Sequence, residues 1–271
     1  GAEANEAAIK LARRASFDKG YKNRSEIISM KNSFHGRTLG SMAATGQKKI
    51  HYGFSPLPSG FKHVAFNDAE AARKAVTSKT CAILVEPIQG EGGVNISDKN
   101  YLRDLKKICT ENDLLLIFDE VQTGFGRTGN LFAYQTFNVK PDVIILAKAL
   151  GGGVPIGAIG ATNKVMKHFI PGTHAATFGG NPLSCAAALA SLKVLTSQGF
   201  LDKAKETGDY FKSSLEELKT KFPIITNVRS RGMTLAATLS KPAAPVVMDC
   251  MEKGYLINCV QLNTLRFIPP L

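Results

Sequence analysis

Short apolar runs that alternate with amphipathic segments constrain the fold of this chain more than any other feature of its sequence. Four such runs are rich in leucine or β-branched residues and bounded by polar residues, at 26–30, 81–86, 114–119 and 143–147. Amphipathic segments of helical period accompany them, at 4–19, 69–77 and 99–112. Continuous apolar runs are typical of strands buried on both faces of a parallel sheet. The pattern therefore predicts an α/β domain, with a further strand at 156–161.

The C-terminal third of the sequence has a different character. Two long helical segments, at 183–196 and 201–221, precede four short strand-like runs that surround one more helix. The strand-like runs lie at 224–230, 234–239, 255–258 and 264–268. We therefore expect a large domain over residues 1–199 and a smaller α+β domain over residues 200–271. Because the chain begins at a predicted helix start and ends directly after a predicted strand, we expect the large domain to lack its N-terminal part and the small domain to be incomplete.

Composition and charge exclude several classes of protein. The 271 residues are 44% hydrophobic and 21% charged, which is the balance of a soluble globular protein rather than a disordered one. The longest run without a formal charge, 169–192, is interrupted by glycine and proline, so we expect no membrane-spanning segment. The net charge of +12 is spread along predicted helices without a basic run or interleaved aromatic residues, so we expect no nucleic-acid partner.

The cysteines and histidines show no disulfide or metal-binding pattern. None of the five cysteines belongs to a C-x-x-C pair, and the five histidines lack any ligand spacing such as H-E-x-x-H. We therefore expect neither a metal site nor a disulfide framework. A reducing, cytoplasmic compartment suits this use of cysteine.

Two nucleotide-binding motifs are present only in part. Gly124-x-Gly126-x-x-Gly129 matches the dinucleotide fingerprint, but no helix-forming segment follows it, and no acidic strand end lies at the required spacing. The run 114–120 resembles the acidic strand of a nucleoside triphosphatase, yet the chain has no G-x-x-x-x-G-K-[ST] loop to hold phosphates. A nucleotide-binding module is therefore disfavoured.

Asp119 and Lys148 form a more specific combination. Asp119 ends one apolar run and Lys148 directly follows another, so both are expected at the carboxyl edge of the sheet, where open α/β sheets bind ligands. Lys148 stands in a wholly apolar stretch, where burial penalises an ammonium and favours the neutral, nucleophilic amine. Such a lysine can form a Schiff base. The alternative is a lysine that extends to solvent from the sheet edge.

These residues, with others, match the needs of a pyridoxal phosphate site. Such a site requires a lysine, a carboxylate at the pyridinium nitrogen, a phosphate cradle and a side chain stacked on the ring. Gly1 and Ala2 open a predicted helix whose free N–H groups can hold a phosphate. Phe34 can stack on the ring, so the sequence offers a candidate for each requirement.

Six stretches of the sequence resemble the class III, or ornithine-type, aminotransferases. They occur in the family's order, at 1–8, 34–38, 86–93, 118–129, 147–153 and 177–182. The resemblance covers nearly the whole chain. It implies the fold type I of pyridoxal-phosphate enzymes, which is a mainly parallel sheet flanked by helices with a smaller C-terminal α+β domain.

The resemblance assigns the contacts to the cofactor ring residue by residue. Lys148 would form the Schiff base and carry the proton, and Asp119 would pair with the pyridinium nitrogen. Gln122 would bond to the ring hydroxyl, and Phe34 would stack on the ring.

The resemblance also assigns the phosphate contacts. Backbone N–H groups of Gly1 and Ala2 would hold the phosphate, together with Thr177 of the neighbouring subunit. A homodimer with a shared active site is therefore implied.

Substrate contacts follow from the same resemblance. Arg266 matches the arginine that binds the substrate α-carboxylate, and Glu91 matches a switch carboxylate that pairs with this arginine when an ω-amino substrate is bound. Arg37 would bind the distal carboxylate of an acidic substrate. Glu86 and His35 would support the site from behind Asp119, although a strand cap for Glu86 and a surface role for Arg37 are alternatives.

Within the family, the runs 34–40, 44–47 and 53–61 are most similar to those of enzymes that act on N2-acetylornithine. The resemblance therefore implies transfer of its terminal amino group to 2-oxoglutarate, which gives N-acetylglutamate semialdehyde and glutamate in arginine biosynthesis. One alternative is another ω-aminotransferase, acting on ornithine, succinylornithine, succinyl-diaminopimelate or 4-aminobutyrate. Another is a non-catalytic binding protein with the same fold.

Overall fold

A mainly parallel sheet organises the N-terminal part of the chain in the computed structural model, which describes all residues 1–271. The sheet has six strands in the order β2-β1-β3-β6-β7-β8, and only β8 runs antiparallel to its neighbour. The strands are β1 (Glu26–Met30), β2 (Phe61–Val64), β3 (Thr80–Val85), β6 (Leu115–Asp119), β7 (Val143–Leu146) and β8 (Ala158–Ala161). The expected apolar runs all form strands of this sheet, and β2 is an addition to them.

Helices cover both faces of this sheet, as the apolar runs predict. On one face α1 (Ala2–Asp18) packs with α7 (Asn163–Met166), and on the other lie α4 (Ala69–Ala75) and α5 (Tyr101–Glu111). Successive residues of a strand face opposite sides: Ile27 packs with α1, whereas Ile28 packs with α5. Both faces are therefore apolar, which is why these strands read as continuous apolar runs rather than alternating ones.

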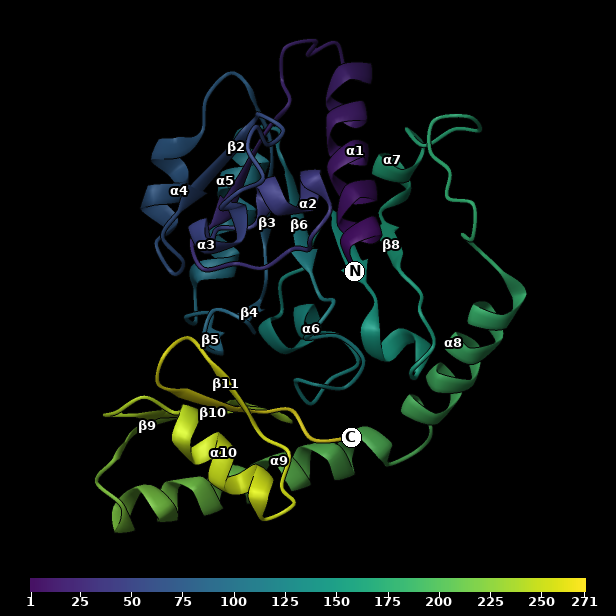
Figure 1. Cartoon of the computed structure of the whole chain (residues 1–271). Helices are drawn as coiled ribbons and strands as arrows, with labels where there is room; N and C mark the ends of the chain where they lie inside the picture. The colour runs from purple at the N-terminus through teal and green to yellow at the C-terminus, as the bar shows by residue number, and fades with distance from the viewer.

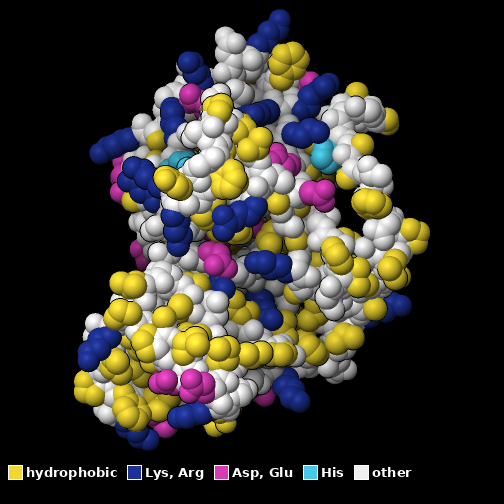
Figure 2. Space-filling model, in the orientation of Figure 1, with side chains coloured by type: hydrophobic (Ala, Val, Ile, Leu, Met, Phe, Trp, Pro, Cys, Tyr) yellow, Lys and Arg dark blue, Asp and Glu magenta, His cyan; other side chains and the backbone are white.

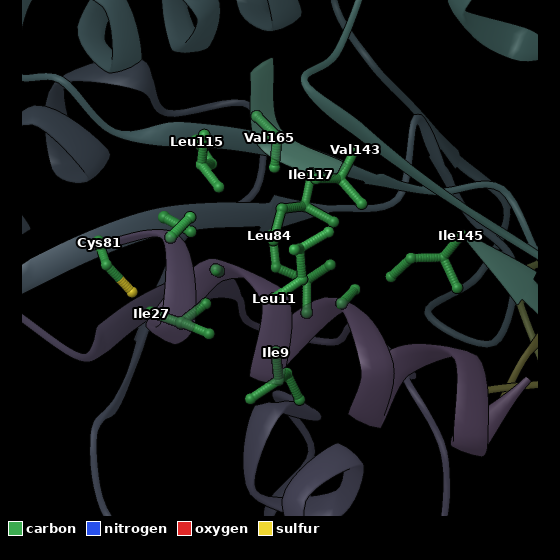
Figure 3. Close-up of a cluster of buried hydrophobic side chains, with 14 of the residues drawn as sticks. Ile9, Leu11, Ile27, Cys81, Leu84, Leu115, Ile117, Val143, Ile145 and Val165 are labelled. Atoms are coloured by element: carbon green, nitrogen blue, oxygen red, sulfur yellow. The ribbon is translucent and has the colours of Figure 1, made fainter. Parts of the chain in front are cut away.

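The core beneath α1 is built from branched side chains of the helix and the sheet. Figure 3 shows Leu11 directed at Leu84 and Ile117 in this cluster. Leu11, Ile27 and Ile117 are fully buried. Alanines at positions 4, 8, 12 and 15 occupy the same helix face, so the α1 backbone approaches the sheet closely.

A second, antiparallel sheet forms the smaller unit at the bottom of Figure 1. Its four strands have the order β11-β12-β10-β9. They are β9 (Ile225–Arg231), β10 (Thr234–Leu239), β11 (Asn258–Val260) and β12 (Thr264–Phe267), and they pack with α9 (Phe200–Lys221) and α10 (Ala244–Glu252). The long helix α8 (Pro182–Leu195) leads from the upper unit to α9 (Figure 1). The expected α/β architecture with a smaller α+β part is confirmed.

One expected strand is misplaced. The sequence pattern predicts a strand over 255–258, but Tyr255 and Leu256 are exposed and precede β11. Apolar character alone does not place these residues in the sheet, because nothing packs on them.

We propose that the boundary between the two domains follows residue 199, since α9 begins at Phe200.

Several short elements complete the fold. A two-stranded hairpin of β4 (Ile88–Gln89) and β5 (Asn95–Ile96) lies between the two larger sheets (Figure 1). The remaining elements are α2 (Leu39–Ala44), α3 (Lys48–His51), α6 (Ala133–Phe137) and the 3₁₀ helix η1 (Lys148–Gly151). None of the helices combines the length and the apolar character that crossing a membrane requires.

We expect Leu11→Ala to lower the free energy of unfolding by about 2–5 kcal/mol, because it leaves a cavity beneath α1. Urea denaturation followed by circular dichroism measures this loss. Phe17→Ala is the matched control, since Phe17 lies on the same helix but is 54% exposed, and its cost should stay near 0.5 kcal/mol or below. Equal losses in the two variants would contradict the burial of Leu11 between α1 and the sheet.

Candidate active site

A cleft of about 1700 Å³ opens at the carboxyl ends of β6 and β7. Its walls come from the first turn of α1, the loops after these two strands, the segment 174–181 and the end of β12. Of the expected site residues, six line the cleft: Gly1, Glu91, Gln122, Lys148, Thr177 and Arg266. Figure 2 shows basic side chains and an acidic one gathered at the hollow between the upper and lower parts of the molecule.

Asp119 lies just behind this cleft at the end of β6, where it is almost completely buried. Its Oδ2 accepts hydrogen bonds from Asn5 Nδ2 at 2.9 Å and pairs with His35 Nδ1 at 2.8 Å. Its Oδ1 accepts the Val121 N–H at 3.0 Å. Burial alone raises the pKa of Asp119, but these donors outweigh burial and hold its pKa below the ordinary value. The carboxylate is therefore ionised and can hold a cation.

Glu86 supports the same region from the end of β3. Its Oε2 accepts the Phe34 N–H at 3.0 Å, and its Oε1 accepts the Gly90 N–H at 3.4 Å. Burial raises the pKa of Glu86 to about 7, the neighbouring His35 opposes the rise, and the charge of Asp119 adds to it. Glu86 thus joins the loop that carries Phe34 to the loop that carries Glu91, which goes beyond the strand cap considered from the sequence.

Lys148 follows β7 directly and begins η1 in a left-handed backbone conformation, with φ of +48°. The sequence argument that apolar neighbours bury this lysine is wrong. Ala147 and Leu150 are buried, but Lys148 itself is exposed on the wall of the cleft. The tight turn at the strand end, rather than the apolar run, determines where the side chain points.

Each of the three glycines at 151–153 is required for a different structural reason. A Cβ on Gly151 would lie 2.9 Å from Ile156 Cγ2, and one on Gly152 would lie 2.3 Å from Ser191 Oγ of α8. Gly153 has open space around it but a φ of +115°, which only glycine adopts readily. The glycine run therefore lets α8 pack against η1 and turns the chain along the cleft.

The N-terminus of α1 faces the cleft with its first N–H groups free, because the N-cap residue Gly1 has no side chain that could accept hydrogen bonds from them. Two glycine-containing turns pass close to it. A Cβ on Gly36 would lie 2.7 Å from Ala2 Cβ, and one on Gly157 would lie 3.3 Å from Ala4 Cβ. The first turn of α1 is therefore surrounded by backbone and small side chains, which suits an anion.

Glu91 and Arg266 form an ion pair on the wall of the cleft. Arg266 Nη1 and Glu91 Oε1 are 2.7 Å apart, and the arginine side chain is 12% exposed. Arg266 lies on β12 and Glu91 on the loop between β4 and β5, 175 residues away in the sequence. The two residues that the sequence comparison with the family linked are thus in contact.

Besides Asp119, Glu86 and His35, three expected residues lie outside the lining of the cleft. Phe34 is half-buried on the loop before α2, and Ala2 lies in the first turn of α1. Arg37 is exposed, with its guanidinium carbon 5.6 Å from the centre of the Phe34 ring.

Thr177 lines the cleft, but it lies on the exposed segment 170–181 that arches away from the part of the molecule that contains the six-stranded sheet (Figures 1 and 2).

Two residues at the site were not assigned a role from the sequence. Asn5 donates to Asp119 from the buried face of α1. The sequence does carry an indication of this role, because Asn5 is a polar residue on the same helix face as the apolar residues Ala8, Ile9 and Ala12. Glu120 accepts the Tyr134 N–H at 2.8 Å and also the Ala133 N–H, so it fastens the start of α6. Burial raises the pKa of Glu120 to about 7.

The residues at the cleft fit pyridoxal phosphate. Gln122 Oε1 and His35 Nε2 are buried without a hydrogen-bond partner in the protein, and an unpaired buried acceptor is costly. A Cβ on Gly90 would lie 1.5 Å from Gln122 Oε1, so the glycine keeps room for this amide. An ionised Asp119, a helix N-terminus, a lysine and an unsatisfied amide together match the pyridinium, phosphate, aldehyde and hydroxyl groups of that cofactor.

Comparison with known proteins agrees with this geometry. The family model for class III aminotransferases matches residues 1–271. The acetylornithine aminotransferase of Caldanaerobacter subterraneus subsp. tengcongensis is 52% identical over 100% of this chain and 69% of its own length. That of Methanocaldococcus jannaschii is 51% identical over 100% of this chain and 68% of its own.

Solved structures show the same fold. The ornithine aminotransferase of Toxoplasma gondii ME49 superposes with a TM-score of 0.95 at 37% identity, over 100% of this chain. The chain spans 66% of that protein. Another structure of the T. gondii enzyme is described with pyridoxal phosphate at partial occupancy in its active site. From the family match over its whole length and this level of identity, the chain belongs to the class III aminotransferases.

Proposed function

We propose that the protein transfers the terminal amino group of N2-acetylornithine to 2-oxoglutarate with pyridoxal phosphate, giving N-acetylglutamate semialdehyde and glutamate, as in arginine biosynthesis. The observation that carries this proposal is the Glu91–Arg266 ion pair on the wall of the cleft that also holds Lys148. The identity of about half of all residues with acetylornithine aminotransferases supports the choice of amino donor.

The chain's own residues supply the binding and proton-handling steps. When bound, pyridoxal phosphate supplies an electron-accepting ring for the carbon that bears the amine. Asp119 holds the proton on the ring nitrogen, because its carboxylate stays ionised among its three donors. The Lys148 amine anchors the cofactor and moves the proton that transamination transfers. Gln122 bonds to the ring hydroxyl.

The remaining cofactor contacts are proposals of the same kind. The first N–H groups of α1, at Gly1 and Ala2, hold the phosphate. Phe34 is kept near the ring by the hydrogen bond between its N–H and Glu86. His35 orients Asp119 rather than touching the substrate, since its Nδ1 bonds directly to that carboxylate.

The ion pair explains how one cleft accepts two kinds of substrate. While Glu91 is paired with Arg266, the arginine is not free to bind the α-carboxylate of an amino acid. The substrate can then bind with its terminal amine toward the cofactor. Once Glu91 moves away, Arg266 binds the α-carboxylate of 2-oxoglutarate in a bidentate fashion. Arg37 is our proposed contact for the distal carboxylate.

Ornithine is a second candidate donor, because the T. gondii ornithine aminotransferase has the same fold at 37% identity. Initial rates with acetylornithine, ornithine, succinylornithine, succinyl-diaminopimelate and 4-aminobutyrate, each with 2-oxoglutarate, distinguish the donors. The highest kcat/KM with acetylornithine would support our proposal, and the highest with another donor would replace it.

A homodimer would complete the cleft. Large apolar side chains are exposed on α8 and just before it, at Phe178, Leu183, Leu189 and Val194. Such a surface is typical of a contact with another chain. Phe178 and Thr177 belong to the lining of the cleft, so a second copy docked here would lie at the active site. We also propose a cytoplasmic location, which the five free cysteines support.

Lys148→Ala should abolish transamination while non-covalent binding of pyridoxal phosphate persists, since phosphate and ring contacts come from other residues. Absorbance spectroscopy with borohydride reduction should label Lys148 in the parent protein and leave this variant unlabelled. Lys140→Ala is the control, because Lys140 is exposed before β7. Full turnover of the Lys148 variant would remove this lysine from the mechanism.

Asp119→Asn should leave the fold nearly intact but raise the activation barrier by about 3–5 kcal/mol, because a neutral amide cannot keep the ring nitrogen protonated. Steady-state kcat with acetylornithine measures the loss. Asp113→Asn is the control, since Asp113 is an exposed acid in a turn. An Asp119 variant within about tenfold of the parent rate would contradict the proposed role.

Leu189→Asp should dissociate the dimer, because it places a charge in an apolar contact. Light scattering coupled to size-exclusion chromatography should then give the mass of one chain rather than two. Leu218→Asp is the matched control: Leu218 is 40% exposed on α9, and its variant should remain dimeric. A dimeric Leu189 variant would place the interface elsewhere.

A further inference from the structure

Arg229 reaches from the small sheet into the loop that carries Glu91. It lies on β9, and its Nη2 donates to Gly93 O at 2.7 Å while its Nε donates to Val94 O at 3.2 Å. Its Nη1 donates to Thr238 Oγ1 at 2.9 Å. All three hydrogen bonds end on uncharged oxygens. A half-buried guanidinium is thus held by backbone carbonyls of the loop rather than by an acid.

The loop between β4 and β5 has a few hydrogen bonds of its own: Asn95 Nδ2 donates to Gly92 O at 2.9 Å, and the N–H groups of Gly93 and Val94 donate to Gly90 O at 3.4 Å. Gly90, Gly92 and Gly93 give it conformational freedom, and Gly93 has a φ of +116°. Val94 is fully buried with a φ of +53°, which is unfavourable for a β-branched residue. Such a conformation persists only where surrounding contacts hold it. The carbonyl of this strained residue is one of the two that Arg229 binds.

Other contacts join the loop to the same sheet. Gln261, in the turn between β11 and β12, donates from Nε2 to Glu91 O at 2.9 Å. Val94 packs with Ala236 of β10 and with Ile88. Arg266 lies on β12, which is paired with β10 and β11. The sheet that carries Arg266 therefore also holds the backbone on which its partner Glu91 stands.

We propose that Arg229 is a positioning residue that fixes the loop 90–94 so that Glu91 meets Arg266, and this rests on the proposed function. Arg229 acts through Glu91 and touches neither substrate nor cofactor. Without its hydrogen bonds, the glycine-rich loop samples more conformations and Glu91 spends less time against Arg266. An uncovered Arg266 favours substrates that present an α-carboxylate over those that present a terminal amine.

The first test measures the loop itself and needs no cofactor. Hydrogen–deuterium exchange of the purified apoprotein, followed by mass spectrometry, reports on the amides of residues 90–94. Arg229→Gln should speed their exchange by about tenfold or more, the effect expected for losing hydrogen bonds from a charged donor. Arg231→Gln is the matched control, since Arg231 ends the same strand but is exposed and lies over the Phe137 ring. Its exchange should match that of the parent.

The second test measures the two half-reactions separately in single turnovers of the holoenzyme. Arg229→Gln should lower the rate with acetylornithine by about tenfold and leave or raise the rate with glutamate, as Glu91→Ala should. The double variant should change no further than Glu91→Ala alone, because Arg229 acts through that carboxylate. Arg229→Lys keeps the charge and can donate to one carbonyl. It should therefore show smaller shifts in the same direction, and it replaces the Gln variant if that variant does not fold.

The outcomes separate this proposal from the proposed function. Unchanged exchange at residues 90–94, or an equal fall in both half-reactions, would overturn the positioning role. A parent protein that lacks any reaction with acetylornithine would instead overturn the proposed function. In that case, faster exchange at residues 90–94 in the Arg229 variants would still show that Arg229 holds this loop. An exchange rate equal to that of the parent protein would refute it.

Discussion

The organisation of the site depends on keeping one buried carboxylate ionised. Asp119 sits at the end of a strand with almost no exposure to water, and burial of this kind favours the neutral acid. Three donors reverse that preference, and each comes from a different part of the chain: Asn5 of α1, His35 of the loop before α2, and the Val121 amide. Meeting this requirement brings the first turn of α1 and the loop of Phe34 to the same sheet edge.

The elements that the sequence predicts best are those with a regular local pattern of apolar residues. Strands β1, β3 and β6 are buried on both faces, and β7 is buried on one face and half-buried on the other, so their apolar runs reveal them. Because the strands are parallel, the ends of β6 and β7 that carry Asp119 and Lys148 lie at the same edge of the sheet. Strand β2 was missed because Phe61–Val64 is only half-buried at the sheet edge and contains lysine and histidine. The two-residue strands β4 and β5 are too short to show any period.

Site features that depend on distant contacts are harder to predict from the sequence. Local apolar character suggested a buried Lys148, whereas the left-handed turn at that residue directs it to the cleft. The contact of Glu91 with Arg266 spans 175 positions and came from family resemblance, not from any local pattern. Arg229 gave no signal, because an arginine in a strand looks like a surface residue until its acceptors in another loop are known.

The glycine run after Lys148 bears on how this segment can change in evolution. Gly151 is limited by the volume of a neighbouring side chain, Ile156, so a smaller residue there can compensate for an alanine at position 151. Gly153 is limited only by its own backbone torsion, and no change elsewhere in the sequence relieves that. Among homologues, position 151 should therefore covary with position 156, while position 153 should be invariant without any covarying partner.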